Sequence, residues 1–191
     1  MSELIRYEVD DQGIATITWD MQTSPMNVLN EDSIRAYSEL VDKAIADENV
    51  KGVVVTSAHR EFIAGADLRE LLRSSEQSAE DMYAWIQNLQ GLFRKQETGK
   101  KPFVAAINGT ALGGGLELTL ACHYRVAVDN PKAKLGLPEV KLGLLPGGGG
   151  TQRLCRLLGY GRAMEMVMGG EMIDGAEAHR IGLVNHLAEP E

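Results

Sequence analysis

Residues 103–122 read FVAAINGTALGGGLELTLAC, and this stretch decides the fold. Phe103–Ile107 is a short apolar run without polar alternation, which is typical of a strand buried in a sheet. Three glycines at 113–115 follow it and open an apolar segment at 116–122 that predicts a helix. A buried strand that passes through a glycine turn into a helix is the building unit of α/β sheets.

The segments on either side of this stretch predict the same fold class. Upstream we expect a hairpin at Ile5–Val9 and Ile14–Trp19, a helix from Asn30 to about Asp47, a strand at 52–56 buried on both faces, a loop at 58–68 and a helix at about 78–95. Downstream we expect a strand at Tyr124–Val128, a segment at 135–150 rich in Gly, Leu and Pro, helices at 151–158, 163–168 and Gly175–Arg180, and a closing strand at 183–187. Alternating strands and helices predict one α/β domain over residues 1–191, with a largely parallel sheet.

Composition and charge argue against several classes of protein. A chain of 191 residues that is 44% hydrophobic and 24% charged is typical of one globular domain. The net charge of −8 argues against binding to nucleic acid or to an anionic membrane. We see no signal peptide and no apolar stretch near the roughly 18 residues of a membrane span. Cys122 and Cys155 lack a CxxC spacing, which predicts no disulfide framework and fits a reducing cytoplasm.

Three motifs are candidates for chemistry. Residues 62–68, FIAGADL, form a loop of small side chains where the backbone can approach a ligand. Residues 108–117, NGTALGGGLE, would present N–H groups to a negative oxygen at a helix start, with Glu117 one turn inside. Residues 137–154, LPEVKLGLLPGGGGTQRL, place Glu139 among apolar neighbours, where burial would raise its pKa and let it exchange a proton.

Each motif alone also has a structural explanation. Taken alone, the first is better explained by a tight turn and the second by a carboxylate favoured at a helix start. The third is explained equally well by a solvent-facing loop glutamate. Two other kinds of site are disfavoured by the motifs. The glycines at 147–150 are not followed by the Gly-Lys-Ser/Thr of a phosphate-binding P-loop. Leu118 occupies the position where a dinucleotide-binding fingerprint needs Gly or Ala. There is no Gly-x-Ser-x-Gly, and the four histidines lack metal-ligand spacing, so we expect no metal.

Taken in this order, the three motifs resemble the enoyl-CoA hydratase/isomerase (crotonase) family over nearly the whole chain. Residues 24–29, SPMNVL, are most similar to the hydratase/isomerase portion of multifunctional fatty-acid oxidation subunits in this family. The resemblance implies a crotonase-like (ClpP/crotonase) ββα spiral. It also implies C-terminal helices that are missing here, so we expect an N-terminal fragment of a longer protein.

The resemblance implies the residues of the site as well. It places the two N–H donors of an oxyanion hole at Ala66 and Gly114, and the catalytic carboxyl groups at Glu117 and Glu139. It implies substrate binding by Ala64, Ala66, Asp67, Leu68, Arg69 and Gly114. Cations in loops beside the motif strands are expected to meet the phosphates of coenzyme A: Arg60, Arg69, Lys100 and Lys101. No cofactor is implied, because coenzyme A is part of the substrate.

The implied reaction is hydration of trans-2-enoyl-CoA to 3-hydroxyacyl-CoA in fatty-acid β-oxidation, with 3-enoyl to 2-enoyl isomerisation as a second reaction. Glu117 would act mainly on the water and Glu139 mainly at C2. The alternatives are another acyl-CoA enzyme on this fold, such as an isomerase or a thioester hydrolase, and a non-catalytic CoA-binding or assembly module. The implied partners are an acyl-CoA substrate and either further copies of the chain or, in a longer protein, a thiolase subunit.

Overall fold

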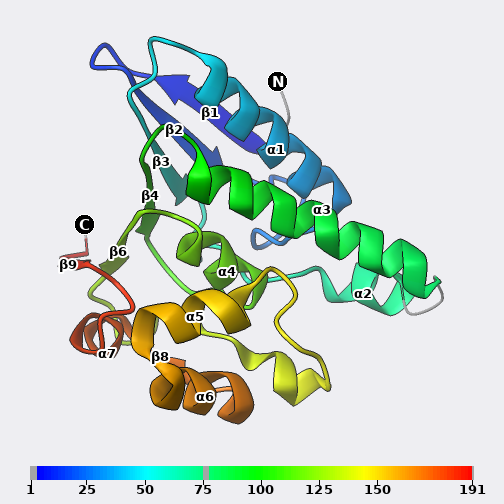
Figure 1. The fold of residues 1–191 in the computed structure, drawn as a ribbon. Coiled ribbons are helices and arrows are strands. Elements are labelled where there is room, and N and C mark those ends of the chain that lie inside the picture. Colours follow the sequence, from blue (N-terminus) through cyan, green and yellow to red (C-terminus); the bar gives the residue numbers. More distant parts are fainter. Residues whose placement is uncertain (1–3, 75–77, 191) are drawn as a thin grey trace.

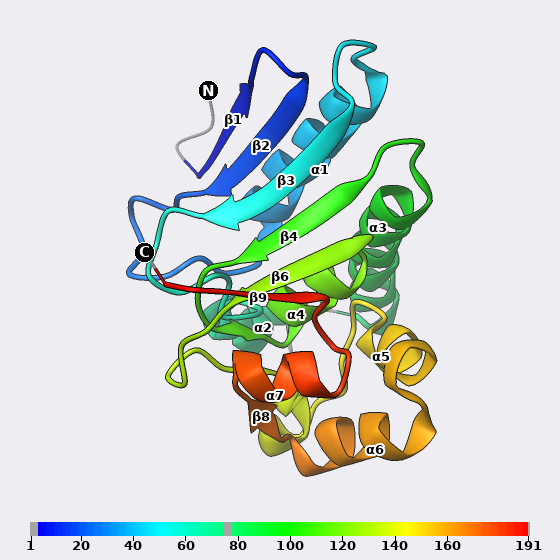
Figure 2. The same cartoon turned by 90° about the vertical axis from the view of Figure 1, so that its left-hand side faces the viewer.

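A six-stranded sheet forms the frame of the molecule (Figures 1 and 2). The computed structural model describes residues 4–74 and 78–190. The strand order is β1-β2-β3-β4-β6-β9, and every neighbouring pair is parallel except the β1–β2 hairpin. The strands are β1 Ile5–Val9, β2 Ile14–Trp19, β3 Gly52–Ser57, β4 Phe103–Ile107, β6 Tyr124–Val128 and β9 His186–Ala188. The predicted α/β class with a largely parallel sheet is confirmed.

Helices α1 (Glu31–Ala46) and α3 (Ala79–Thr98) cover one face of this sheet (Figure 1). Helix α1 begins at an Asn30 cap, whose side chain accepts the Ser33 N–H, and buries Tyr37 and Val41 against the core. Among the described residues no helix lies in front of β2, β3 and β4 on the other face, which Figure 2 turns towards the viewer.

This arrangement corrects the expectation that strand 52–56 is buried on both faces. Val53 and Val55 point to the covered face and are fully buried. Val54 and Thr56 are only partly buried, because successive side chains of a strand point to opposite faces. An apolar run of β-branched residues therefore does not distinguish a strand covered on two faces from one covered on a single face.

A second layer lies beside the β6–β9 edge of this sheet (Figure 2). It holds a small sheet of β5 (Ala111–Leu112), β7 (Leu135–Gly136) and β8 (Met172–Ile173), together with the 3₁₀-helix Pro138–Leu142. Its helices are α2 Leu68–Ser74, α4 Gly114–Leu120, α5 Gly150–Leu158, α6 Tyr160–Gly169 and α7 Gly175–Arg180. Sequence patterns missed α2, the 3₁₀-helix and the three short strands, and strands of two residues are too short to show a period.

The predicted closing strand at 183–187 is wrong in its first half. Leu183 and Val184 form a turn after α7, where both N–H groups donate to the Ala178 carbonyl, and the strand begins only at His186. Both residues are apolar because they fill the core at the helix end, where Gly182 adopts a φ of +82°.

Neither a membrane-spanning helix nor a disulfide is found among the described residues. Within residues 4–74 and 78–190, no helix combines the length and the apolar character needed to cross a bilayer. Cys122 is buried and Cys155 partly buried, and both are free thiols.

Candidate active site

The first two motifs meet where β3 and β4 end. A Cβ built on Gly65 would lie 3.0 Å from the Leu112 carbonyl oxygen, and one built on Gly113 would lie 3.9 Å from the Gly65 Cα. Both glycines also have positive φ, +103° and +52°. Only glycine combines this backbone conformation with so close an approach, so the two loops touch because of these residues.

Two backbone N–H groups at this junction have no acceptor within the described residues. They belong to Ala66 and to Gly114, the first residue of α4. The neighbouring N–H groups of Asp67 and Gly113 are both used, since they donate to backbone carbonyls at 2.9 Å. The junction therefore offers two unused donors to an external oxygen, one from each predicted motif.

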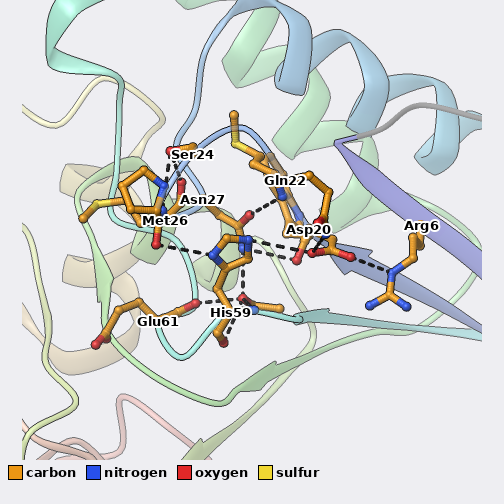
Figure 3. A network of polar contacts seen from close by, with 12 residues as sticks. Arg6, Asp20, Gln22, Ser24, Met26, Asn27, His59 and Glu61 are labelled. Carbon is orange, nitrogen blue, oxygen red and sulfur yellow. Dashed lines mark hydrogen bonds and ion pairs between the residues drawn. The ribbon is translucent and has the colours of Figure 1, made fainter.

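Asn27 holds the first of these loops in place (Figure 3). Its side chain is fully buried, and its Nδ2 donates to the Phe62 carbonyl at 3.1 Å and to Ser57 Oγ at 2.9 Å. Its backbone carbonyl accepts the Ala64 N–H at 2.9 Å. Sequence reasoning missed this role, because the polar side chain acts on a loop more than thirty positions later.

Glu117 lies in α4 with its side chain withdrawn from solvent, at 2% exposure. Its Oε1 accepts the Gly150 N–H at 2.7 Å, and a Cβ on either Gly148 or Gly150 would come within 2.9 Å of its oxygens. Burial raises the pKa of Glu117, while the N–H groups of Gly150 and Gly148 and the charge of Arg153 oppose that rise. The glycine run at 147–150 thus forms the surface that receives this carboxyl group, a role that the motif alone did not reveal.

Glu139 approaches the same junction from the 3₁₀-helix. Its Oε1 would lie 3.0 Å from a Cβ on Gly113. Its Oε2 is buried and has no hydrogen-bond partner among the described residues. Burial raises the pKa of Glu139 to about 7, a rise that a hydrogen bond from its own backbone opposes and that the charge of Glu117 increases. The structure thus brings Ala66, Gly114, Glu117 and Glu139 together around Gly113.

The predicted binding residues at 64–69 divide into two groups. Ala66 and Asp67 border a cavity of about 240 Å³ whose apolar lining includes Leu29, Leu71, Met82 and Trp85. Asp67 also caps α2, since its Oδ1 accepts the Arg69 N–H at 2.8 Å. Leu68 and Arg69 are exposed in the first turn of α2, and Ala64 is partly buried beside Asn27.

The expectation for Lys101 is wrong. It precedes β4 and therefore lies at the opposite end of that strand from the Gly113 junction. Its Nζ donates to the carbonyls of Ala44 and Asp47, which end α1. This lysine stabilises a helix C-terminus, where carbonyl oxygens attract a cation, and is occupied there. Lys100 lies at the same end of β4.

Comparisons with known proteins agree with this geometry. The family model described as enoyl-CoA hydratase/isomerase matches residues 10–190. A fatty acid oxidation complex subunit alpha from Idiomarina loihiensis is 44% identical over 181 residues, which cover 94% of this chain and 25% of that relative. One from Shewanella frigidimarina is 46% identical over 177 residues, covering 92% and 24%. The chain therefore spans about a quarter of the length of these curated relatives.

Solved structures show the same relation. A crystal structure named "Enoyl-CoA hydrates" from Geobacillus kaustophilus HTA426 superposes with a TM-score of 0.91 at 34% identity, covering 100% of this chain and 69% of the other. The enoyl-CoA hydratase from Bacillus anthracis gives a TM-score of 0.87 at 34% identity, covering 97% and 70%. The family match and these two sets of relatives agree along nearly the whole chain. The chain, with its crotonase-like fold, therefore belongs to the enoyl-CoA hydratase/isomerase family.

Proposed function

We propose that this chain hydrates trans-2-enoyl-CoA thioesters to 3-hydroxyacyl-CoA thioesters in fatty-acid β-oxidation. One observation carries the proposal: two unused N–H donors and two carboxyl groups converge on Gly113. Glu117 is buried and held by donors of the glycine run, and Glu139 is partly buried with one oxygen that has no partner among the described residues. The family and the name of the relatives, fatty acid oxidation complex subunit alpha, supply the substrate class.

The N–H groups of Ala66 and Gly114 would bind the thioester carbonyl oxygen. Negative charge grows on this oxygen when a nucleophile attacks C3, because the electron pair moves through C2 into an enolate. Donors that are fixed before the reaction stabilise that charge without reorganisation, typically by about 3 kcal/mol for each donor. Gly65 and Gly113 hold the two donor loops in contact, so the donors are fixed in this way.

The two glutamates would divide the proton transfers. Glu117 takes a proton from water as the water oxygen bonds to C3, and Glu139 gives its proton to C2, so that one water adds across the double bond. A pKa of about 7 leaves Glu139 partly protonated at neutral pH, as a proton donor must be. The N–H groups around Glu117 favour its ionised form, as a base requires. The cycle closes when the proton returns from Glu117 to Glu139.

The remaining assignments follow the substrate. We place the acyl chain along the apolar side of the cavity that borders Ala66, formed by Leu29, Leu71, Met82 and Trp85. The coenzyme A portion would lie along 64–69, with Arg69 as the cation of this segment that meets its phosphates. We further propose a cytoplasmic enzyme, in accord with its free thiols, that acts with further copies of itself or with a thiolase subunit.

Isomerisation of 3-enoyl-CoA to 2-enoyl-CoA is a second activity that the site supports. It requires one group that removes a proton from C2 and returns it at C4. Glu139 meets this requirement, because a carboxyl group with a pKa of about 7 and an unpartnered oxygen accepts and releases a proton readily at neutral pH.

The test is the loss of enoyl absorbance with a 2-enoyl-CoA, together with product analysis for a 3-enoyl-CoA. We expect 3-hydroxyacyl-CoA from the first and 2-enoyl-CoA from the second. Gly114→Val should abolish hydration, because its Cβ would lie 2.5 Å from Leu29 Cδ1 and the side chain would crowd the donor. Gly91→Val, in open space on α3, is the matched control. Release of free coenzyme A would indicate a hydrolase, and binding without turnover a non-catalytic module.

A further inference from the structure

The glycine run that receives Glu117 is itself held from behind by side chains of two helices. Gln90 in α3 donates from Nε2 to the Gly147 carbonyl at 2.7 Å. Arg153 in α5 donates from Nη1 to the Gly148 carbonyl at 2.8 Å. A glycine run has little conformational preference of its own, so contacts of this kind determine how its peptide groups are oriented.

The Gln90 contact determines where one particular N–H points. In a trans peptide group the C=O and the N–H point in opposite directions, and the described chain has no cis peptide bond. The Gly147 carbonyl and the Gly148 N–H belong to the same peptide group. When Gln90 holds that carbonyl on one side, the Gly148 N–H must point to the other.

Glu117 lies on that other side. A Cβ on Gly148 would lie 2.9 Å from Glu117 Oε2, so carboxyl and backbone are in direct contact. The Gly148 N–H faces the carboxyl group and favours its ionised form. Together with the Gly150 N–H on Oε1, it surrounds the carboxyl group with donors.

Arg153 anchors the next peptide group, and its own position is fixed by Glu97 at 3.2 Å, with only 12% of its side chain exposed. Because Arg153 also acts on Glu117 through its charge, removing it would change two things at once. Gln90 is neutral, and its side chain donates a hydrogen bond to the loop at Gly147. Its removal therefore changes the orientation of the loop without removing a charge.

We propose that Gln90 is a positioning residue: by holding the Gly147 carbonyl it aims the Gly148 N–H at the Glu117 carboxylate. The effect of Gln90 on hydration rests on the proposed function, in which Glu117 must be ionised to take a proton from water. The effect of Gln90 on the pKa of Glu117 does not rest on that function, because the ionisation of Glu117 can be measured without any substrate.

The experiment compares Gln90→Met with Gln87→Met. Methionine matches the length of glutamine and removes the donor, and Gln87 lies exposed one turn earlier on the same helix. Titration of ¹³C-labelled carboxyl groups by NMR, with Glu117→Gln to assign the signal, should show the pKa of Glu117 rising by roughly one unit in Gln90→Met. The acidic limb of kcat/KM for hydration should move to higher pH by the same amount, with KM unchanged. Gln87→Met should show neither change.

Two results would overturn the proposal. One is an unchanged Glu117 titration in folded Gln90→Met. The other is a loss of activity that is equal at every pH, which would make Gln90 a purely structural residue. Failure of the proposed function gives a different result: the Glu117 titration shifts as expected while neither the parent chain nor the variant hydrates an enoyl-CoA.

Discussion

Glu117 and Glu139 both lie beside Gly113, but Glu117 is buried and accepts N–H donors from the glycine run, whereas Glu139 is partly buried and its only N–H donor is that of its own backbone. Glu117 lies in α4, inside the core, and faces the glycine run. Glu139 lies in a single 3₁₀ turn whose next residue, Val140, is exposed, and one of its oxygens is buried without a partner. The same side chain thus occupies a donor-rich environment in one region and a donor-poor environment in the other.

This difference explains how one site can contain both a base and an acid. Burial raises the pKa of either carboxyl group, and only nearby donors or cations oppose that rise. The two groups also repel each other when both are ionised, and the charge of Glu117 contributes to the raised pKa of Glu139. The proposed division of roles follows from these surroundings.

The largest effect is expected for Glu117→Gln, which removes the base but keeps the shape. Hydration should fall by about 10³-fold in kcat, the middle of the range for general base catalysis. Isomerisation should retain a measurable part of its rate, because it needs no water. Steady-state assays with a 2-enoyl-CoA and a 3-enoyl-CoA measure both reactions, and an equal loss of the two would contradict the division of roles.

Glu139→Gln should lower both reactions, by roughly 300-fold each. Both need a group that exchanges a proton at C2, and an amide cannot do so. The same pair of assays measures this effect. Full hydratase activity in this variant would show that Glu139 does not protonate C2. The assignment of Glu117 as the base and Glu139 as the acid would then be wrong.

The same substitution should stabilise the fold at high pH. The pKa of Glu139 is about 7 in the folded protein against an ordinary value of 4.5, so the folded state binds the proton more tightly than the unfolded chain. The parent protein therefore loses stability as the pH rises from about 4.5 to about 7 and does not regain it above. Glu139→Gln removes this loss. Because solvent screens a partly exposed carboxyl group, the gain should be about 1 to 2 kcal/mol at pH 8 and almost nothing at pH 4.

Urea unfolding of Glu139→Gln at the two pH values measures that gain. The control is Glu48→Gln, at an exposed position in a loop. An equal gain at pH 4 and pH 8 would show that ionisation of Glu139 does not destabilise the folded protein. The pKa of Glu139 would then not be raised, and its proposed role as the acid would lose its physical basis.

The smallest effect is expected for Gly148→Ala. The new Cβ would lie 2.9 Å from Glu117 Oε2 and 2.8 Å from Phe93 Cε2, so the carboxyl group must move by a few tenths of an ångström. We expect hydration to fall by about tenfold in kcat/KM, since small displacements of a reacting group are costly. Gly161→Ala, in open space on α6, should have no effect on activity. Unchanged hydration in Gly148→Ala would show that the glycine run does not position Glu117.

Much of the fold could be predicted because its signals are local. The hairpin β1–β2, the strands β4 and β6 and the helix α7 have the predicted bounds, since alternation, apolar runs and caps act within a few residues. The same local signals misled at 183–187, where apolar side chains fill a turn, and they missed the two-residue strands, which are too short for a period.

The sequence by itself determined the candidate residues Ala66, Gly114, Glu117 and Glu139, because motif and resemblance depend on residue type and order. Only the tertiary structure decided the different surroundings of the two glutamates. The residues responsible act across long stretches of chain, as Gln90 does on Gly147 and Gly150 on Glu117, 57 and 33 positions apart. A pKa depends on which donors face a carboxyl group and how deeply it is buried, and both are properties of the folded chain.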